Sequence, residues 1–529
     1  MSQLLEHLPI LVILFPLIAT LLCPLISHFN SDWGKRTVIS ALFIAAICAG
    51  LQLWQVVKTG EAIHYYIGGW PPIYGIEFVV DGLSGVIILL VAIASWITAL
   101  FSSPFERLER EELGAGSPSG SNVRPSGYYS MLSFLSLGLL GMASTGDAFN
   151  LYVFMEITAI SGYGLIAVGE SKGPIAAFRY LLIGTIGACM YLMGAGFLYA
   201  ATGTLNMEDL SRSVAELGES PLIIFAVACM IIGFGIKMAL FPLHGWQPAA
   251  HSYAHPGADP MIAGIMIKVP AYAMLRFFFF VFQENTPVMD LFFDVIGVLA
   301  VCGVLFGSLK ALRYETYNKI LAYSSIGQVG YIAMGFAIGN YYGLVGAVLH
   351  IVSHAFMKSG LFYTSGSLKY KYGIHEITQL GQVYRDMPVT SMAMVVCALS
   401  MVGLPPFAGF FSKWYLALGA IENGQYLFVA VLILSSLLSA IYFFRVFEKM
   451  FMESKTVSER EDTAFLAKKG SGKGSGSGRL SSGKSHFELP WQLLIPMVIV
   501  ILAIILIGLF NSYIVGDVIG PTLKEVALL

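Results

Sequence analysis

Charged residues are scarce in this chain. Asp, Glu, Lys and Arg make up 12% of its 529 residues, whereas 57% are apolar and the mean hydropathy is +0.75. A water-soluble domain of this length carries roughly 25% charged residues, so the composition excludes an ordinary soluble protein. It predicts an integral membrane protein instead.

The sequence also lacks cysteine clusters and nucleotide-binding loops. No Gly-rich dinucleotide loop follows a strand, so no redox cofactor is expected, and any redox reaction would belong to a partner subunit. We expect no bound cofactor and no catalytic chemistry in this chain itself. The six cysteines lie singly in apolar runs, and we interpret them as packing residues: Cys23, Cys48, Cys189, Cys229, Cys302 and Cys397.

Three histidines lie close together in the segment FPLHGWQPAAHSYAHP: His244, His251 and His255. Such a group can indicate a metal site. We disfavour this interpretation because the segment is interrupted by prolines, lacks supporting carboxylates and is predicted to be a loop. No metal is expected.

Apolar runs long enough to cross a bilayer recur from end to end, and they predict an all-α polytopic protein with about fourteen transmembrane helices. The first run is expected to be a span rather than a cleaved leader. The expected spans are residues 7–28, 36–57, 79–102, 128–146, 149–168, 174–202, 221–244, 258–282, 289–309, 318–337, 341–367, 388–418, 425–450 and 490–513.

The distribution of basic residues predicts the orientation. Alternate loops lie on the same side of a membrane, and the cytoplasmic side carries the excess of Lys and Arg. One set of loops is rich in them and includes Lys35, Arg36, Arg107, Arg110, Arg124, Lys172, Lys310, Arg313, Lys369, Lys371, Arg385 and the stretch 455–484. The other set has little beyond Lys58, Arg212 and Lys524. Both termini are therefore predicted outside a bacterial or archaeal cytoplasmic membrane.

Three segments between the spans have distinct compositions. Residues 111–127 and the Gly/Ser-rich 468–485 are predicted to be solvated linkers, whose basic residues set the topology rather than bind nucleic acid. Residues 62–78, with aromatics and Gly/Pro turns, predict an external hairpin or interfacial cap. We divide the chain into spans 1–3 (1–102), a first repeat (128–282), a second repeat (289–450), a basic cytoplasmic loop (451–489) and the last span with its tail (490–529).

A few ionisable residues fall inside the predicted spans. A charge at the centre of a bilayer costs at least about 2.5 to 3.5 kcal/mol on insertion scales, so such residues are candidates for function. A structural salt bridge or a side chain reaching to the interface is the alternative for any single one. One carboxylate cannot neutralise several lysines, which points to a proton relay. The candidates are Glu156, Lys237, Lys268, Lys413, His350, His354 and Lys358.

Spacing strengthens this interpretation. His350, His354 and Lys358 recur at intervals of four and share one helix face, although a pair of hydrogen-bonded core histidines would give the same pattern. Lys237 is followed by Pro242, and Lys413 is preceded by Gly403 and two prolines, so both helices are predicted to be broken. Paired breaks are typical of inverted repeats in transporters, here spans 4–8 and 9–13.

Several motifs carry a family resemblance over nearly the whole chain: FPLHGWQPAAH after Lys237, AGIMIKVPAYAMLRF around Lys268, NKILAYSSIGQVGYIAMG, HIVSHAFMKSGLF and GLPPFAGFFSKW. The chain resembles the antiporter-like subunits shared by respiratory complex I, membrane-bound hydrogenases and Mrp-type multisubunit cation/proton antiporters. Within this family, the stretch GGWPPIYGIEFVVDGLSG is most similar to the MrpD branch of the Mrp-type antiporters.

The resemblance implies fourteen helices with two inverted five-helix repeats, and other membrane subunits as partners. It implies a controlling ion pair between Glu156 and Lys237, and Lys268 as the link between half-channels. His350 and His354 would continue the wire to Lys413 at the exit. From the sequence itself we add Lys358 and His244 as further candidates for the relay.

Three functions remain open. The first is a proton-conducting subunit of a multisubunit antiporter that exchanges Na⁺ for H⁺. The second is the proton-pumping membrane subunit of a redox-driven complex of the NADH-quinone oxidoreductase or hydrogenase type. A stand-alone uniporter or solute transporter is the weakest, because no pocket for an organic substrate stands out.

Overall fold

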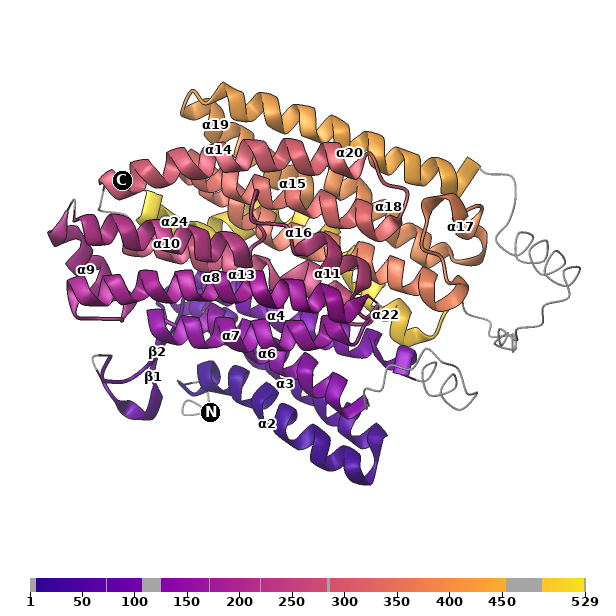
Figure 1. Cartoon of the computed structure of the whole chain (residues 1–529), viewed down its shortest axis with the longest axis horizontal. Helices are drawn as coiled ribbons and strands as arrows, with labels where there is room; N and C mark the ends of the chain where they lie inside the picture. The colour runs from indigo at the N-terminus through magenta and orange to yellow at the C-terminus, as the bar shows by residue number, and fades with distance from the viewer. Residues whose placement is uncertain are drawn as a thin grey trace, which may run out of the picture.

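The chain folds as a bundle of long helices that run nearly side by side (Figure 1). The computed structural model describes residues 6–72, 74–106, 125–170, 172–218, 220–282, 286–452 and 488–527. Within these residues, eleven helices are long and apolar enough to cross a bilayer by length and composition. The predicted all-α membrane fold is confirmed.

Each of the fourteen intervals predicted as spans contains helix. The uninterrupted long helices are α2 (Leu8–Phe29), α3 (Ser31–Thr59), α4 (Gly82–Phe101), α6 (Pro125–Ser144), α7 (Ala148–Ala167), α8 (Gly173–Thr202), α14 (Thr286–Ala311), α15 (Tyr317–Ile338), α16 (Tyr341–Tyr372), α20 (Tyr426–Met452) and α22 (Trp491–Leu509). The exact number of membrane crossings and the inverted repeats stay predictions, as does the division of the chain into five parts.

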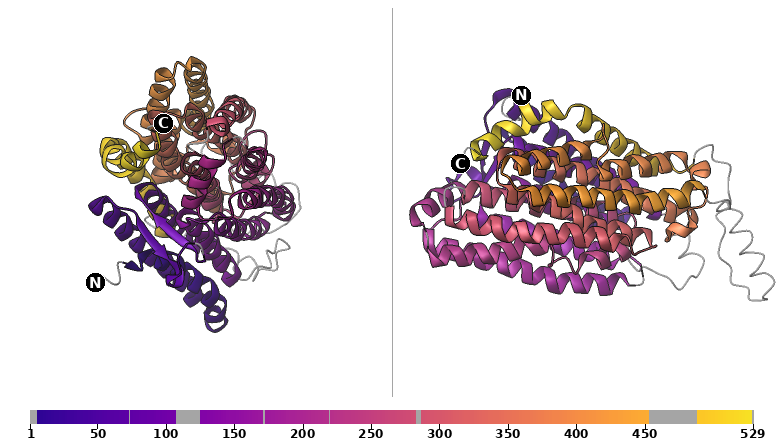
Figure 2. Two further views of the ribbon diagram at one scale, coloured as in Figure 1. Left: turned by 90° about the vertical axis from the view of Figure 1, so that its left-hand side faces the viewer. Right: turned by 90° about the horizontal axis from the view of Figure 1, so that it is seen from above.

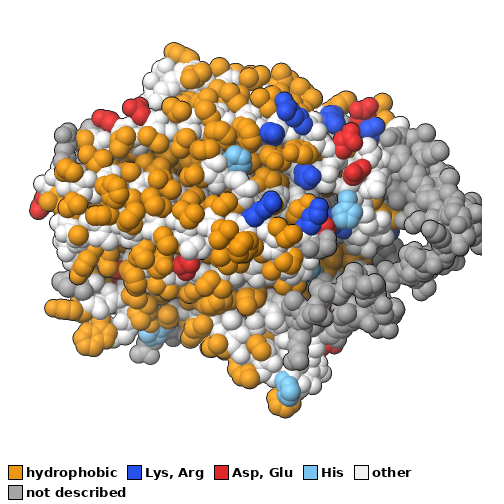
Figure 3. Space-filling model, in the orientation of Figure 1, with side chains coloured by type: hydrophobic (Ala, Val, Ile, Leu, Met, Phe, Trp, Pro, Cys, Tyr) orange, Lys and Arg blue, Asp and Glu red, His pale blue; other side chains and the backbone are white. Residues whose placement is uncertain are grey.

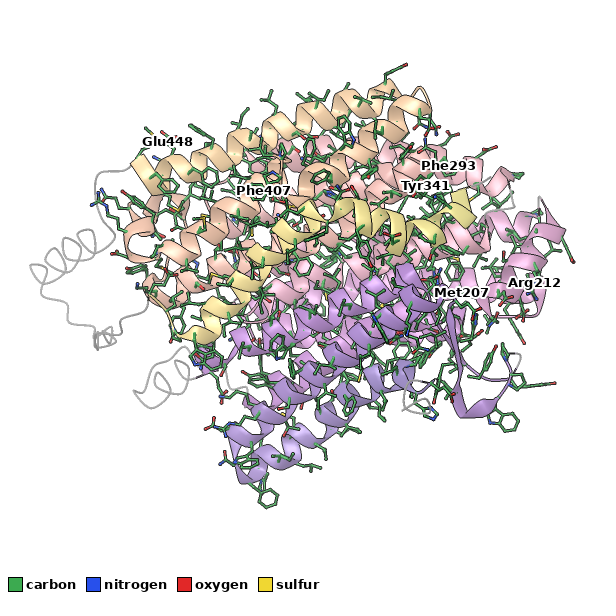
Figure 4. The ribbon with its side chains drawn as sticks, turned by 180° about the vertical axis from the view of Figure 1, so that it is seen from behind. Met207, Arg212, Phe293, Tyr341, Phe407 and Glu448 are labelled. Atoms are coloured by element: carbon green, nitrogen blue, oxygen red, sulfur yellow. The ribbon has the colours of Figure 1, made fainter. Side chains whose placement is uncertain are left out.

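Two of the remaining helices are broken where the sequence predicts it. Helix α10 (Pro221–Lys237) ends at Lys237, and α11 (Gln247–Tyr253) follows after nine irregular residues. Helix α18 (Pro388–Val402) ends before Gly403, which has a φ of 91°, and α19 (Ala408–Glu422) follows the prolines. A positive φ of this size suits glycine, so the break is built into the local sequence. Phe407, the last residue of this break, is labelled in Figure 4.

A third interruption was not predicted. Residues 259–281 form α12 (Asp259–Met261), the π-helical turn η2 (Ile262–Met266), α13 (Lys268–Arg276) and a second π-helical turn, η3 (Phe277–Val281). A π-helical turn shifts the backbone hydrogen bonds by one residue and is frequent at functional sites. Lys268 therefore lies where one hydrogen-bond pattern gives way to another.

One end of the bundle carries a β-hairpin, as predicted for residues 62–78. Strands β1 (Ile63–Tyr66) and β2 (Glu77–Val80) pair antiparallel, with Tyr66 opposite Glu77. Helix α9 (Met207–Leu217) lies beside them, and its labelled residues Met207 and Arg212 mark this end in Figure 4. The Asn206 amide donates to Glu77 at 2.9 Å and ties the hairpin to α9. We call this the hairpin end.

Basic side chains mark the opposite end. The Lys and Arg side chains visible in Figure 3 gather toward the end away from the hairpin. Lys172, Lys310 and Lys369 lie here, at the start of α8 and the ends of α14 and α16. We call this the basic-loop end. After η5 (Ile514–Ile519), the last described helix is α24 (Gly520–Ala527), and Figure 2 places both chain ends toward the hairpin end.

The predicted linkers fall mostly outside the described residues. All of 468–485 does so, and of 111–127 only the last three residues are described. There the prediction was wrong, because α6 already begins at Pro125. Proline is well suited to the first turn of a helix, where its missing N–H has no helical partner to lose.

The centre of the bundle is formed by α15 and α16. In each of these helices 94% of the most apolar window is buried within the chain, against 28% for α2 and 33% for α20. Helix α16 contacts α15, α18, α19 and α22. Ionisable side chains on α16 are therefore shielded from lipid by the protein itself.

Candidate functional site

The only predicted carboxylate of the relay is paired with a lysine. The Lys237 ammonium donates to Glu156 Oε1 at 3.2 Å. Lys237 is the last residue of α10, so the break in the chain leaves its side chain at the helix end, facing α7. The lysine side chain is 3% exposed and the glutamate 26% exposed. The contact that the family resemblance implies is thus present.

Lys268 is satisfied by its own helix. Its Nζ donates to the Ala263 carbonyl at 2.6 Å, and the side chain is buried. Ala263 belongs to the π-helical turn η2, where the backbone hydrogen-bond pattern is altered. Among the described residues, no carboxylate lies within ion-pair distance of Lys268. A buried amine with a carbonyl partner needs no counter-ion when it is neutral.

Lys358 is held in the same way by α15. Its Nζ donates to the Leu321 carbonyl and to the Ser324 hydroxyl, both at 2.6 Å. Lys268 and His354 lie within electrostatic range of it. The centre of the bundle thus gathers basic groups from α13 and α16.

The two histidines of α16 stack on each other. Their ring centroids are 5.6 Å apart with an interplanar angle of 17°, and His350 Nδ1 is 2.9 Å from the Ser412 hydroxyl. His350 Nε2 and both ring nitrogens of His354 are buried without a hydrogen-bond partner among the described residues. Buried polar groups require partners, and ordered water commonly supplies them. The described part of the chain thus supplies a partner for one of the four ring nitrogens, His350 Nδ1.

Lys413 is bound by the end of a broken helix. Its Nζ donates to the carbonyls of Met401 and Val402 and to the Ser436 hydroxyl, each at 3.0 Å. These carbonyls close α18, where no further turn accepts them. The partial negative charge at a helix C-terminus favours a cation. The break before Gly403 therefore builds the Lys413 site, as the break after Lys237 builds the ion pair.

Tyr331 joins this end of the site and was missed from the sequence. Its ring lies 5.0 Å from Lys413 Nζ and 5.3 Å from the His350 ring, and its hydroxyl is 2.6 Å from the Ser435 hydroxyl. A tyrosine in an apolar run is usually a packing residue, so periodicity gives no signal for it. Only the crossing of α15 and α19 brings it between the histidine and the lysine.

His244 takes a different place. Its ring lies between Phe241 and Phe306, with centroids at 5.5 and 5.0 Å, and its Nδ1 is buried without a partner in the described part of the chain. None of its contacts in the described structure is to another predicted relay residue.

His251 corrects one prediction. The segment around it was interpreted as a loop without supporting carboxylates, yet His251 lies in helix α11, is fully buried, and its Nδ1 is 3.2 Å from Asp259 Oδ1. The carboxylate was overlooked because it follows eight residues later, beyond Pro256. Among the described residues, no three His, Cys, Asp or Glu side chains are grouped as a metal site.

Comparison with known proteins identifies the family of the chain. Residues 145–439 match the family described as NADH:quinone oxidoreductase/Mrp antiporter, transmembrane region. The chain is 41% identical over 517 residues to NADH-quinone oxidoreductase subunit N of Desulforudis audaxviator, covering 97% of this chain and 98% of that one. It is 30% identical to the putative antiporter subunit mnhD2 of Staphylococcus aureus (strain N315), covering 85% of this chain and 87% of the other.

A solved structure shares the fold over the full length. A chain of the membrane-bound sulfane sulfur reductase, an archaeal respiratory membrane complex, superposes with a TM-score of 0.82 at 28% identity, covering 98% of both chains. The family match over residues 145–439 includes both broken helices and all the predicted relay residues. This protein is therefore a multi-pass membrane subunit that belongs to the NADH:quinone oxidoreductase/Mrp antiporter family.

Proposed function

We propose that this chain is the proton-translocating subunit of a multisubunit cation/proton antiporter that exchanges Na⁺ for H⁺. The observation that carries the proposal is the buried series of basic groups from Lys237 to Lys413, of which only Lys237 has a carboxylate partner in the described structure. Buried amines without a counter-ion do not stabilise the core when they are charged. A relay requires them.

Protonation of one group in the series disfavours protonation of its neighbours, because like charges repel. Two positive charges about 8 Å apart repel by about 2 kcal/mol at an effective dielectric constant of 20. A proton that arrives on Lys268 therefore favours release of the proton on a neighbouring basic group. Moving Glu156 toward or away from Lys237 changes how strongly the charged form of that lysine is held, and so it starts or stops the sequence.

Within this proposal each residue has a stated task. Glu156 and Lys237 control the relay, and Lys268 links the two halves. His354 and His350 pass the proton on through water, with Tyr331 and the Ser412 hydroxyl beside them. Lys413 receives it at the end of α18. Lys358 is a further basic station, and His244 lies apart from the others.

We further propose that the basic-loop end faces the cytoplasm and that the protein lies in a bacterial or archaeal cytoplasmic membrane with both termini outside. The excess of Lys and Arg at this end supports the orientation. The partners are other membrane subunits, since the relatives are named as subunits of larger assemblies. The transported ions are H⁺ and Na⁺.

A second function has its own support. The relative with 41% identity is named NADH-quinone oxidoreductase subunit N, and the structurally similar chain belongs to a sulfur reductase complex. In this alternative the same relay is driven by electron transfer in a partner subunit. The residues of the relay and their order do not change.

The two functions differ in what drives the flux. We expect the purified complex in proteoliposomes to move protons when a Na⁺ gradient is applied without any electron donor. Proton movement that requires NADH, hydrogen or another reductant would replace the antiporter with the redox-driven pump. No movement under either condition would contradict both.

A further inference from the structure

One buried carboxylate has no part in the proposed relay. Asp259 is 3% exposed at the start of α12 and lies 3.2 Å from Nδ1 of His251, which is fully buried. The other ring nitrogen of His251, Nε2, is buried without a partner among the described residues. Burying an acid and a base inside a membrane protein costs free energy, so such a pair is a candidate for function.

The His251–Asp259 pair is buried inside the bundle, close to the basic-loop end. Glu170 and Lys369, which form an ion pair at 3.0 Å, are within electrostatic range of the Asp259 carboxylate. The Glu170 side chain is 33% exposed and reaches solvent, whereas that of Lys369 is 10% exposed. The backbone N–H of Glu170 donates to the Tyr253 carbonyl at 2.9 Å, which fixes this loop against the end of α11.

Toward the centre, the pair faces a polar stripe of α16. Residues 358, 362, 365 and 369 follow one another at helical spacing and share one face. The stripe leads from Lys369 through Ser365 to Lys358 and is interrupted by an apolar residue, Phe362. The Phe362 ring lies 5.4 Å from the His251 ring.

A hydrogen-bond chain holds His251 in this position. The Asn318 amide donates to the His251 carbonyl at 3.2 Å, and the Ser365 hydroxyl donates to the Asn318 side-chain oxygen. Helices α15 and α16 thus fix the backbone of α11 while its imidazole stays beside Phe362. The backbone hydrogen bonds fix the orientation of the imidazole and leave its Nε2 nitrogen available to exchange a proton.

We propose that His251 and Asp259 form a proton-holding site through which the buried relay exchanges protons with water at the basic-loop end, with Phe362 as the barrier between this site and Lys358. The inference deepens the proposed function and rests on it. A proton from water binds the neutral imidazole, and the Asp259 carboxylate stabilises the resulting imidazolium. Nε2 then gives its proton to the neutral Lys358 amine through water, so the imidazole becomes neutral and Lys358 an ammonium.

Neighbouring charged groups affect how readily the site takes up a proton. The ionisable groups that interact with Asp259 are His251 on α11, Lys369 on α16 and Glu170 in the loop before α8. The Glu170 carboxylate also lies 4.0 Å from Nδ1 of His375. Breaking the Glu170–Lys369 pair frees a cation and an anion beside the site, so the state of this pair regulates how readily the site is protonated.

The first test needs no transport. In infrared difference spectra of the purified complex recorded as the pH is changed, we expect bands from an imidazolium or carboxyl group that disappear in both Asp259→Asn and His251→Gln. The control Asp209→Asn removes a half-buried carboxylate at the hairpin end, where it pairs with Arg212, and keeps the bands. Identical spectra in wild type and Asp259→Asn would overturn the proposal.

The second test uses flux in proteoliposomes. Asp259→Asn should raise the proton concentration needed at the basic-loop end for half-maximal flux by at least about tenfold, with Asp259→Glu restoring it. The maximal rate at low pH should fall less. An unchanged proton dependence in Asp259→Asn would refute the site. If Asp259→Asn does not assemble by size-exclusion chromatography, His251→Gln decides in the same assay.

The outcomes separate this site from the proposed function. If wild-type complex moves no protons under any condition, the relay proposal fails, while the infrared bands still decide whether the pair titrates. If wild type and Asp259→Asn transport alike, the relay stands and the proton-holding site is rejected. Phe362→Ala should raise proton leak without a Na⁺ gradient, and an unchanged leak would reject Phe362 as the barrier.

Discussion

Replacing Glu156 by Gln tests the ion pair that controls the proposed relay. Two unit charges 3.2 Å apart attract by about 5 kcal/mol at an effective dielectric constant of 20. Removing one partner of a buried pair costs about 3 to 5 kcal/mol, because the other charge stays buried without compensation. Glu156 is 26% exposed, so we expect the lower part of this range for Glu156→Gln.

A double-mutant comparison isolates this effect. Glu156→Gln and Lys237→Gln should each lower the melting temperature of the purified complex, whereas the double variant should melt higher than Glu156→Gln, since it leaves no unpaired charge. All three should lose proton flux. If Glu156→Gln melted like wild type and the double variant melted lower, the pair would contribute nothing and the reasoning would be refuted.

Three further variants probe other parts of the structure. Lys413→Ala should abolish proton flux in proteoliposomes while leaving the complex assembled, because no other amine in the described part of the chain binds the carbonyls that close α18; substantial flux would argue against its role. His350→Ala should reduce flux by about tenfold rather than abolish it, since a water can replace one station; complete loss would show that the imidazole itself is indispensable. Burial, and then the charge of Lys369, lowers the pKa of His375, so the folded chain binds this proton less readily than the unfolded chain. Its contribution to stability is therefore present above pH of about 6.5 and declines as the pH falls below that value, and His375→Gln should flatten this part of the melting-temperature profile; an unchanged profile would contradict the assignment.

Much of the fold could be predicted because its signals are local. Long apolar runs mark the helices, and Pro242 and Gly403 mark the two breaks, since each acts on the backbone of its own helix. The hairpin at 62–78 was likewise predictable from its turn residues. These features depend on a few consecutive positions.

The features that the sequence did not predict depend on tertiary packing. The π-helical turns around Lys268 change which carbonyl accepts a hydrogen bond, and this change cannot be predicted from the spacing of apolar residues. Asp259 was overlooked because it lies eight residues after His251, beyond Pro256, and Tyr331 because it resembles a packing residue. In each case helix packing, which sequence spacing does not encode, brings the partners together.

The central claim is that buried lysines carry the protons, and one comparison tests it most directly. Proton flux would be measured in inverted vesicles for wild type, Lys237→Ala and the control Lys58→Ala. Lys58 lies in the last turn of α3 at the surface, over the Trp54 ring, and has no place in the relay. We predict that Lys237→Ala loses all flux while its complex assembles normally and that Lys58→Ala transports like wild type. Full flux in an assembled Lys237→Ala complex would contradict the account.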